Sequence, residues 1–179
     1  AIKADLKQLK LILKVYKQID SSIITEDIYN ELEERLIEEV DYIKEAQHMN
    51  YYKNIFLNNN LIKVPETISN LSTSKLLTMS WLEGKTLNNF YKTNYNIKNN
   101  IAINLFHAWY IPFYKYGIIH GDPHPGNYTI ANNGKTLNLL DYGCIRIFRG
   151  EFVEAVIKLY IALKNENNNL AAEAYKSWG

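Results

Sequence analysis

The segment at residues 118–127 constrains the fold of this 179-residue chain more than any other. It reads Ile-Ile-His-Gly-Asp-Pro-His-Pro-Gly-Asn, so prolines, glycines and polar side chains follow each other closely. A helical pattern at 97–116 precedes it, and two strand-like runs at 128–131 and 135–140 follow it. The runs are separated by Asn-Asn-Gly at 132–134, and an Asn-Gly pair supplies the positive φ angles of a tight hairpin turn. Because such a loop holds its side chains in a fixed geometry between regular elements, we predict a functional site here.

Three polar residues in and after this loop suit one kind of chemistry. Asp122 and Asn127 are five positions apart and can bracket a single polyatomic group, and Asp141 approaches the same point from the end of the hairpin. Phosphoryl transfer needs one carboxylate to orient the acceptor, together with an Asn and a second carboxylate that hold Mg²⁺ on the nucleotide phosphates. Kinase catalytic loops have the same Asp-x-x-x-x-Asn spacing followed by Asp-Phe-Gly, and here Tyr142 replaces the Phe. The pattern favours an ATP- and magnesium-dependent site.

Two other interpretations of the loop were weighed. The His-x-Asp-x-His run of His120, Asp122 and His124 is compatible with a zinc hydrolase, but it would leave Asp141 without a role. Alternatively, a Gly/Pro loop can simply turn the chain, with its Asp serving as a cap, although three polar residues would then coincide by chance. We predict that His120 instead buttresses the loop.

The remaining histidines and the cysteine are assigned packing roles. His48 and His107 fall within helical patterns and are interpreted as packed or surface residues. Cys144 directly follows the Asp-Tyr-Gly segment at 141–143, and no base lies near it in the sequence, so it is predicted to be a small packed residue rather than a nucleophile.

The rest of the chain is predicted to be mainly helical. Apolar residues at helical spacing begin a first helix, with lysines one position further round: Ile2, Leu6, Leu9, Leu13, Tyr16 and Lys3, Lys7, Lys10, Lys14, Lys17. We interpret the lysine row as a solvated face, with an anionic membrane as the alternative. The further elements are an acidic helix at 26–56 capped by Thr25, strands at 61–64 and 75–81 around a turn at 69–74, the helix at 97–116 with a kink at Pro112 and an end at Gly117, and helices at 151–164 and 170–178.

Composition narrows the classes of function. Lys and Arg number 20 against 19 Asp and Glu, and this near-neutral balance argues against a nucleic-acid partner. A single cysteine cannot form an intramolecular disulfide or a multi-cysteine metal site. No signal peptide and no apolar run of roughly 18 residues is present, so any membrane association is expected through segments outside this chain. We expect a location on the cytoplasmic side, peripheral to the inner membrane.

Two further segments make the resemblance to a known family specific. Residues 38–46 read Glu-Glu-Val-Asp-Tyr-Ile-Lys-Glu-Ala, and residues 77–84 read Leu-Thr-Met-Ser-Trp-Leu-Glu-Gly. Together with the loop at 118–127 and the Asp-Tyr-Gly segment, they give a chain that resembles the UbiB family of atypical, protein-kinase-like proteins, the ubiquinone-biosynthesis and ADCK group. The resemblance covers essentially the whole chain.

This resemblance implies an α+β, protein-kinase-like fold, with an incomplete small lobe at 1–82 and a mainly helical large lobe at 83–179. It also implies the following roles: Glu45 as the helix C glutamate, Glu39 and Asp41 as the family's acidic pair, Met79, Ser80, Trp81 and Leu82 as the hinge whose backbone meets adenine, Asp122 as the catalytic-loop aspartate, and Asn127 and Asp141 as magnesium ligands.

The chain also departs from the family pattern. The alanine-rich nucleotide loop, the Lys-x-Gly-Gln segment and the strand lysine are all expected upstream of residue 1. Lys3 ends an Ala-Ile-Lys run that imitates the lysine strand, but the helical stripe already begins at Ile2. We therefore expect a fragment in which Glu45 lacks its cationic partner, and which binds ATP and magnesium weakly and hydrolyses ATP negligibly.

The implied function is that of an atypical kinase or ATPase that supports ubiquinone (isoprenoid-quinone) biosynthesis, with an isoprenoid-quinone precursor or lipid and quinone-biosynthesis proteins as partners. A small-molecule kinase of the aminoglycoside or choline type is the alternative enzyme, because it also has a His-Gly-Asp loop. A nucleotide-binding pseudokinase or lipid-binding regulatory module is the alternative from another class. The motif at 38–46 counts against the small-molecule kinase, and the retained Asp122, Asn127 and Asp141 count against a dead site.

Overall fold

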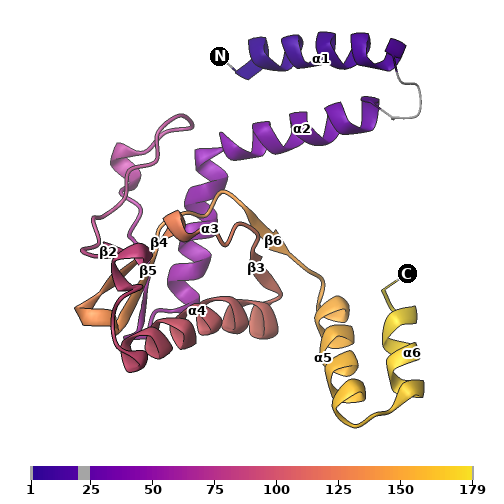
Figure 1. The fold of residues 1–179 in the computed structure, drawn as a ribbon. Helices are drawn as coiled ribbons and strands as arrows, with labels where there is room; N and C mark the ends of the chain where they lie inside the picture. Colours follow the sequence, from indigo (N-terminus) through magenta and orange to yellow (C-terminus); the bar gives the residue numbers. More distant parts are fainter. Residues whose placement is uncertain (1, 20–24, 179) are drawn as a thin grey trace.

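The computed structural model describes the backbone of residues 2–19 and 25–178, and their side chains except at 2–4, 18, 19, 25, 35, 38 and 39 (Figure 1). Six helices and six short strands are found in this part of the chain. The helices are α1 Ile2–Ile19, α2 Thr25–Glu39, α3 Tyr42–Ile55, α4 Tyr95–Tyr116, α5 Gly150–Lys164 and α6 Asn168–Lys176. The strands are β1 Ile62–Lys63, β2 Lys85–Thr86, β3 Ile118–His120, β4 Tyr128–Ala131, β5 Thr136–Leu139 and β6 Ile145–Ile147.

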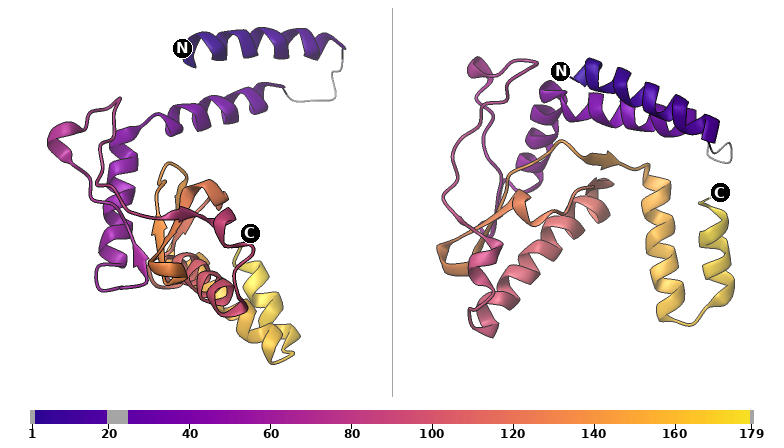
Figure 2. Two further views of the ribbon diagram at one scale, coloured as in Figure 1. Left: turned by 60° about the vertical axis from the view of Figure 1, so that its left-hand side comes forward. Right: turned by 45° about the horizontal axis from the view of Figure 1, so that its top comes forward.

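Helices α1 and α2 form a pair that stands apart from the rest of the molecule (Figures 1 and 2). Leu6 and Tyr29 are buried between them, and the Lys10 ammonium lies 4.8 Å from the centre of the Tyr29 ring. The predicted apolar stripe therefore faces α2, because burying one helical face is what stabilises such a pair. Tyr16, placed in the same stripe by its spacing, is 45% exposed.

The single helix predicted at 26–56 is wrong, because the chain breaks at Val40 and Asp41 into α2 and α3. The carboxylate of Asp41 accepts a hydrogen bond from the backbone N–H of Lys44 at 3.0 Å and so caps the start of α3. An aspartate that binds the backbone in this way favours a new helix start over continuation. α3 then turns away from α2 and runs into the body of the protein (Figure 1).

The predicted hairpin is confirmed and forms the centre of a small sheet. β4 and β5 pair antiparallel, and β1 and β2 flank them in the order β1-β5-β4-β2. The turn residues Asn132, Asn133 and Gly134 have φ values of 49°, 53° and 93°, as the Asn-Gly signal requires. A second ladder, β3 with β6, was not predicted, and it places residues 118–120 in a strand rather than in the loop.

The strand predicted at 75–81 is replaced by an irregular extended arm. Only isolated pairings join it to the preceding segment, at Thr67 with Met79 and at Thr73 with Leu76. Leu71 and Leu76 are each 56% exposed at its tip, so little apolar surface is available there to fix a longer ladder.

The core lies where α3 and α4 meet the hairpin. α4 begins with Asn94 as N-cap, passes through Pro112 and ends at Gly117, whose φ of 68° is the predicted left-handed cap. Met49, Tyr52 and Phe56 of α3 pack with apolar residues of the strands, of α4 and of the connection after β5, among them Ile101, Ala108, Ile130, Leu137, Leu139 and Tyr142. The two predicted C-terminal helices are present as α5 and α6, which pack together as a pair beside α4 (Figure 2).

Candidate nucleotide and magnesium site

The loop side chains Asp122 and Asn127 are hydrogen-bonded to each other. The Asn127 amide nitrogen donates to the Asp122 carboxylate at 3.0 Å and to the Asp122 carbonyl oxygen at 3.1 Å. A short 3₁₀ turn at Pro125–Asn127, in which His124 Nδ1 accepts from the Gly126 N–H at 3.0 Å, brings the two residues together. Because the amide nitrogen makes both contacts, the Asn127 side-chain oxygen has no hydrogen-bond partner in the described part of the chain.

His120 joins this loop to the Asp-Tyr-Gly segment. Its Nε2 lies 2.8 Å from the carbonyl oxygen of Asp141, and its Nδ1 accepts a hydrogen bond from the Asp122 N–H at 3.3 Å. These contacts require a proton on Nε2, so both ring nitrogens of this buried residue are engaged by the protein. The predicted buttressing role is confirmed, and this geometry does not suit a zinc ligand.

The hairpin brings Asp141 next to Asn127. The N–H of Leu140 donates to the carbonyl oxygen of Asn127 at 3.0 Å, and Asp141 follows directly. One Asp141 oxygen accepts from the Gly143 N–H at 2.9 Å, and its second oxygen has no hydrogen-bond partner in the described part of the chain. Burial first, and then the charges of Asp122 and Asp141, raise the pKa of the Tyr128 hydroxyl, so both carboxylates act on the same point.

Helix α3 holds the Asp-Tyr-Gly backbone from the other side. The Glu45 carboxylate accepts from the Tyr142 N–H at 3.4 Å, and His48 Nδ1 lies 3.1 Å from the Tyr142 carbonyl oxygen. The Tyr52 ring packs edge-on against the Tyr142 ring at 5.4 Å. These roles of His48 and Tyr52 were not predicted, although His48 follows Glu45 by three positions and so shares its helical face.

The environment of Glu45 favours its protonated form. Burial raises the pKa of this half-buried carboxyl, the hydrogen bond from the Tyr142 N–H lowers it, and the charge of Asp141 raises it further, with a net upward shift. Within the described residues Glu45 makes no ion pair. Its carboxylate lies against the backbone of Tyr142.

The hinge predicted at Met79, Ser80, Trp81 and Leu82 has one paired and one unpaired edge. The Ser80 N–H donates to the Glu66 carbonyl oxygen at 2.8 Å, and its hydroxyl accepts from the Glu66 N–H at 2.9 Å. Because successive residues of an extended chain point their backbone groups to opposite sides, those of Met79 and Trp81 face away from Glu66. They have no hydrogen-bond partner among the described residues.

The connection after the hinge passes closely over the hairpin. The buried Asn138 side chain donates to the carbonyl oxygen of Glu83 and to the Thr129 hydroxyl, both at 3.0 Å. A Cβ atom at Gly84 would lie 2.6 Å from the Thr129 hydroxyl oxygen, so only glycine fits there without displacement. Asn138 was not predicted either, because its importance depends on a contact with a distant segment.

The acidic pair Glu39 and Asp41 is not brought to the loop by any contact that the structure describes. Asp41 caps α3 and is exposed, while Glu39 ends α2 and its side chain lies outside the described residues. The side chain of Lys3 also lies outside them, although its backbone is helical rather than part of a strand.

The fold and the site together define a kinase-like protein, and the chain matches the ABC1 atypical kinase-like domain over residues 1–175. The chain therefore belongs to the ABC1 atypical kinase-like family, which confirms the resemblance to UbiB proteins. It is similar to protein ACTIVITY OF BC1 COMPLEX KINASE 7, chloroplastic, of Arabidopsis thaliana, with 36% identity over 132 residues, 70% of this chain and 19% of that protein. It is also similar to atypical kinase COQ8B, mitochondrial, of Rattus norvegicus, with 24% identity over 159 residues, 89% of this chain and 30% of that protein.

A solved structure supports the fold. The Rv3197–erythromycin complex from Mycobacterium tuberculosis superposes with a TM-score of 0.80 at 23% identity, covering 97% of this chain and 44% of that one. The predicted kinase-like fold is thus confirmed. The chain spans 19%, 21% and 23% of the length of three chloroplast relatives that it matches.

Two further observations concern metal binding and membrane spans. In the part of the chain that the structure describes, no three His, Cys, Asp or Glu side chains gather closely enough to hold a metal ion by themselves. Among the same residues, no helix has the length and apolar character needed to cross a membrane.

Proposed function

We propose that this chain carries the magnesium and nucleotide site of an atypical kinase or ATPase. The observation that carries the proposal is the joining of Asp122, Asn127 and Asp141: Asn127 bonds to Asp122, and His120 bonds to the backbone of both aspartates. Three acidic or amide side chains held near one another by exposed and partly buried contacts match what phosphoryl transfer requires.

The residues present fit Mg²⁺ and ATP. The Asn127 side-chain oxygen and the second Asp141 oxygen are hard ligands without partners in the described region, and magnesium needs only a few such ligands because it keeps several waters. When bound, the metal would neutralise phosphate charge. Asp122 would orient the acceptor hydroxyl or water, because its carboxylate lies beside this pair and is exposed.

The adenine base is assigned to the hinge. The outward-facing backbone N–H and C=O groups of Met79 and Trp81 offer hydrogen-bond donors and acceptors to the base. Ser80 and Leu82 are the other two residues of the hinge. Glu45 is assigned the role of pairing with a nucleotide-binding lysine, which is not among the described contacts. That lysine would compete with the Tyr142 N–H for the Glu45 carboxylate.

The process and location are also proposals. The resemblance to UbiB proteins implies a role in ubiquinone biosynthesis, with an isoprenoid-quinone precursor or lipid as partner. The proposed place is peripheral to an inner membrane, and two of the similar proteins are named as chloroplastic and mitochondrial.

The test compares Asp122→Asn with the unchanged protein that carries this chain. Because Asp122 faces the acceptor rather than the nucleotide phosphates, the variant should hydrolyse or transfer phosphate about a hundredfold more slowly, at near-constant ATP affinity. Rates would be measured as ADP release, and affinity by titration. Normal turnover by the variant would remove Asp122 from the mechanism, and ATP binding without turnover in the unchanged protein would favour the pseudokinase.

A further inference from the structure

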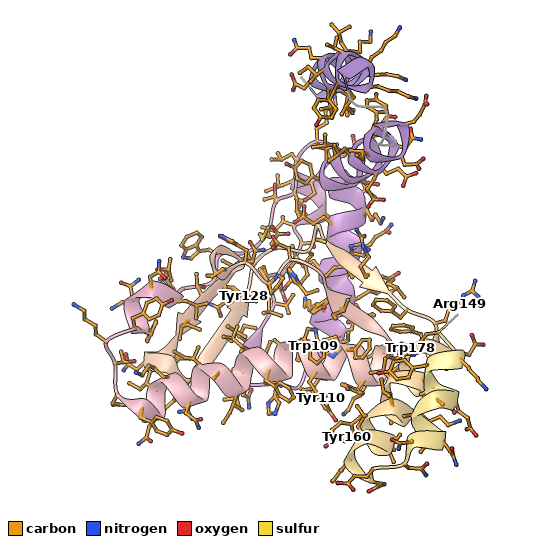
Figure 3. The ribbon with its side chains drawn as sticks, turned by 45° about the vertical axis from the view of Figure 1, so that its right-hand side comes forward. Trp109, Tyr110, Tyr128, Arg149, Tyr160 and Trp178 are labelled. Carbon is orange, nitrogen blue, oxygen red and sulfur yellow. The ribbon has the colours of Figure 1, made fainter. Side chains whose placement is uncertain are left out.

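A cavity of about 360 Å³ lies directly behind the loop that carries Asp122. Its walls come from α3, α4, the loop and the hairpin: Tyr52, Leu87, Leu105, Ala108, Trp109, His120, Pro123, Pro125, Tyr128 and Leu139. Tyr52, Ala108 and Leu139 are buried and form the floor, while Trp109, Pro123 and Pro125 are exposed and form the rim. Figure 3 labels Trp109 on α4 and Tyr128 on β4, two of the elements that enclose it.

One residue of the lining carries a buried polar group that has no partner in the described part of the chain. Tyr52 is 0% exposed, and its hydroxyl is the single buried side-chain nitrogen or oxygen without a hydrogen bond among the described residues. The neighbouring Tyr142 hydroxyl, in contrast, donates to the Leu139 carbonyl oxygen at 2.9 Å. Burial raises the pKa of the Tyr52 hydroxyl, so this group keeps its proton and acts as a donor. Buried donors without partners are rare in native proteins and call for a physical explanation.

Water is a poor partner for this hydroxyl. A buried water needs two to four polar contacts, whereas both nitrogens of His120 are already engaged and most of the lining is apolar. The Tyr128 hydroxyl and the Trp109 indole N–H are the other polar side-chain groups of the lining. A ligand that supplies one acceptor and otherwise presents hydrocarbon matches the walls better, because apolar pockets with a few placed polar groups bind such molecules.

We propose that this cavity binds a small, mainly apolar molecule whose single hydrogen-bond acceptor meets the Tyr52 hydroxyl. Its size suits a fused or substituted ring, because an apolar cavity of about 150 Å³ already holds benzene and this one measures about 360 Å³. The lining contains no hinge residue and neither Asn127 nor Asp141, although His120 and Tyr128 of the lining adjoin the two aspartates, so the inference does not depend on the proposed function. It shares Pro123 and Pro125 with the loop, so a bound molecule would restrict the backbone on both sides of His124.

Two ligands of one shape test the proposal. α-Tetralone carries a single carbonyl acceptor and no donor, and tetralin is its hydrocarbon counterpart. Titrations of the 179-residue chain, followed by amide NMR shifts, should show α-tetralone binding about fivefold more tightly than tetralin, with shifts in α4 and β4. Equal affinities, or shifts elsewhere on the protein, would overturn the proposal.

Three variants make the test specific. Tyr52→Phe keeps the ring and removes the hydroxyl, so it should abolish the preference for α-tetralone while leaving tetralin binding unchanged. Tyr128→Phe removes the other hydroxyl of the lining and should retain the preference. Ala108→Leu should block both ligands by filling the cavity, and its NMR spectrum shows whether it has folded. If Tyr52→Phe keeps the preference, or only Tyr128→Phe loses it, the hydroxyl of Tyr52 is not the recognition group.

Discussion

His120 Nε2 lies 2.8 Å from the carbonyl oxygen of Asp141, although His120 is the last residue of β3 and Asp141 follows the end of β5. The same ring accepts from the N–H of Asp122, so one imidazole sets the distance between the loop and the Asp-Tyr-Gly segment. Since both hydrogen bonds are to backbone groups, the position of each aspartate depends on the ring rather than on the aspartate side chains. The ring therefore ties the loop to the Asp-Tyr-Gly segment.

Replacing His120 should be costly for stability. His120→Phe keeps an aromatic ring in the buried site but leaves the Asp141 carbonyl and the Asp122 N–H without their partner, which should lower the free energy of unfolding by about 1–3 kcal/mol. Urea denaturation followed by circular dichroism measures the loss. His107→Phe is the matched control, because His107 lies on α4 and contacts Phe106 through its ring, and it should change stability by no more than about 0.5 kcal/mol. Equal effects of the two substitutions would show that the bridge is unimportant.

Glu45 should make stability depend on pH in a defined direction. Its folded pKa is raised, so the folded protein binds the proton more tightly than the unfolded chain, and stability falls as pH rises from the usual glutamate value of 4.5 through the raised value. Glu45→Gln keeps an acceptor for the Tyr142 N–H and cannot ionise. It should therefore melt at a higher temperature than the unchanged protein at pH 7, with the gap closing toward pH 4.

The same pH series can also contradict this prediction. Melting temperatures of both proteins would be followed by circular dichroism between pH 4 and pH 8. If the advantage of Glu45→Gln grew on acidification, the pKa of Glu45 would be lowered in the folded state, and the effect of burial would have been misjudged.

Asp41 should act first as a helix cap. Asp41→Ala removes the acceptor for the Lys44 N–H and should destabilise the protein by about 1 kcal/mol, whereas Asp41→Asn keeps an acceptor oxygen and should be nearly neutral. Thermal unfolding compares the two. If both variants were neutral, the break between α2 and α3 would not depend on this cap. If Asp41→Asn kept full stability but lost turnover, Asp41 would have the additional role that the family resemblance implies.

Gly84 should tolerate no side chain. In Gly84→Ala the new Cβ would lie 2.6 Å from the Thr129 hydroxyl oxygen and 2.9 Å from the Asn138 amide nitrogen, so one of them must move. We expect a loss of about 1–3 kcal/mol from this overpacking. Gly150→Ala is the control, because nothing lies within 4 Å of its Cβ position at the start of α5. Similar stability of the two variants in urea would show that the hinge connection does not lie tightly against the hairpin.

Local signals predicted the parts of the fold that local chemistry decides. The turn at Asn133 and Gly134 and the cap at Gly117 follow from backbone preferences that a few residues set on their own. The break at Asp41 was missed because the acidic pattern continues across it, and the cap is visible only in the contact with Lys44.

The site was predictable only as far as its motif extends. Asp122, Asn127 and Asp141 stand out by spacing, and the structure joins Asn127 to Asp122 through their side chains. The contributions of His48 and Tyr52 depend on the contact of α3 with a segment far along the chain. The spacing of residues along the sequence gives no sign of such a contact. Short strands such as β3 likewise exist because a partner strand is present, so their own residues carry little signal.

The central claim is that Asn127 and Asp141 hold magnesium on a nucleotide, and calorimetric titration with ATP tests it most directly. The 179-residue chain would be titrated with ATP in Mg²⁺ and in EDTA at fixed ionic strength, beside Asp141→Asn and the exposed control Glu151→Gln. We expect weak binding that Mg²⁺ strengthens by about tenfold in the unchanged chain and in Glu151→Gln, because metal and nucleotide bind cooperatively. Asp141→Asn should bind ATP equally in Mg²⁺ and in EDTA. If Asp141→Asn responded to Mg²⁺ as the unchanged chain does, or the unchanged chain did not respond at all, the magnesium site would not lie at Asn127 and Asp141.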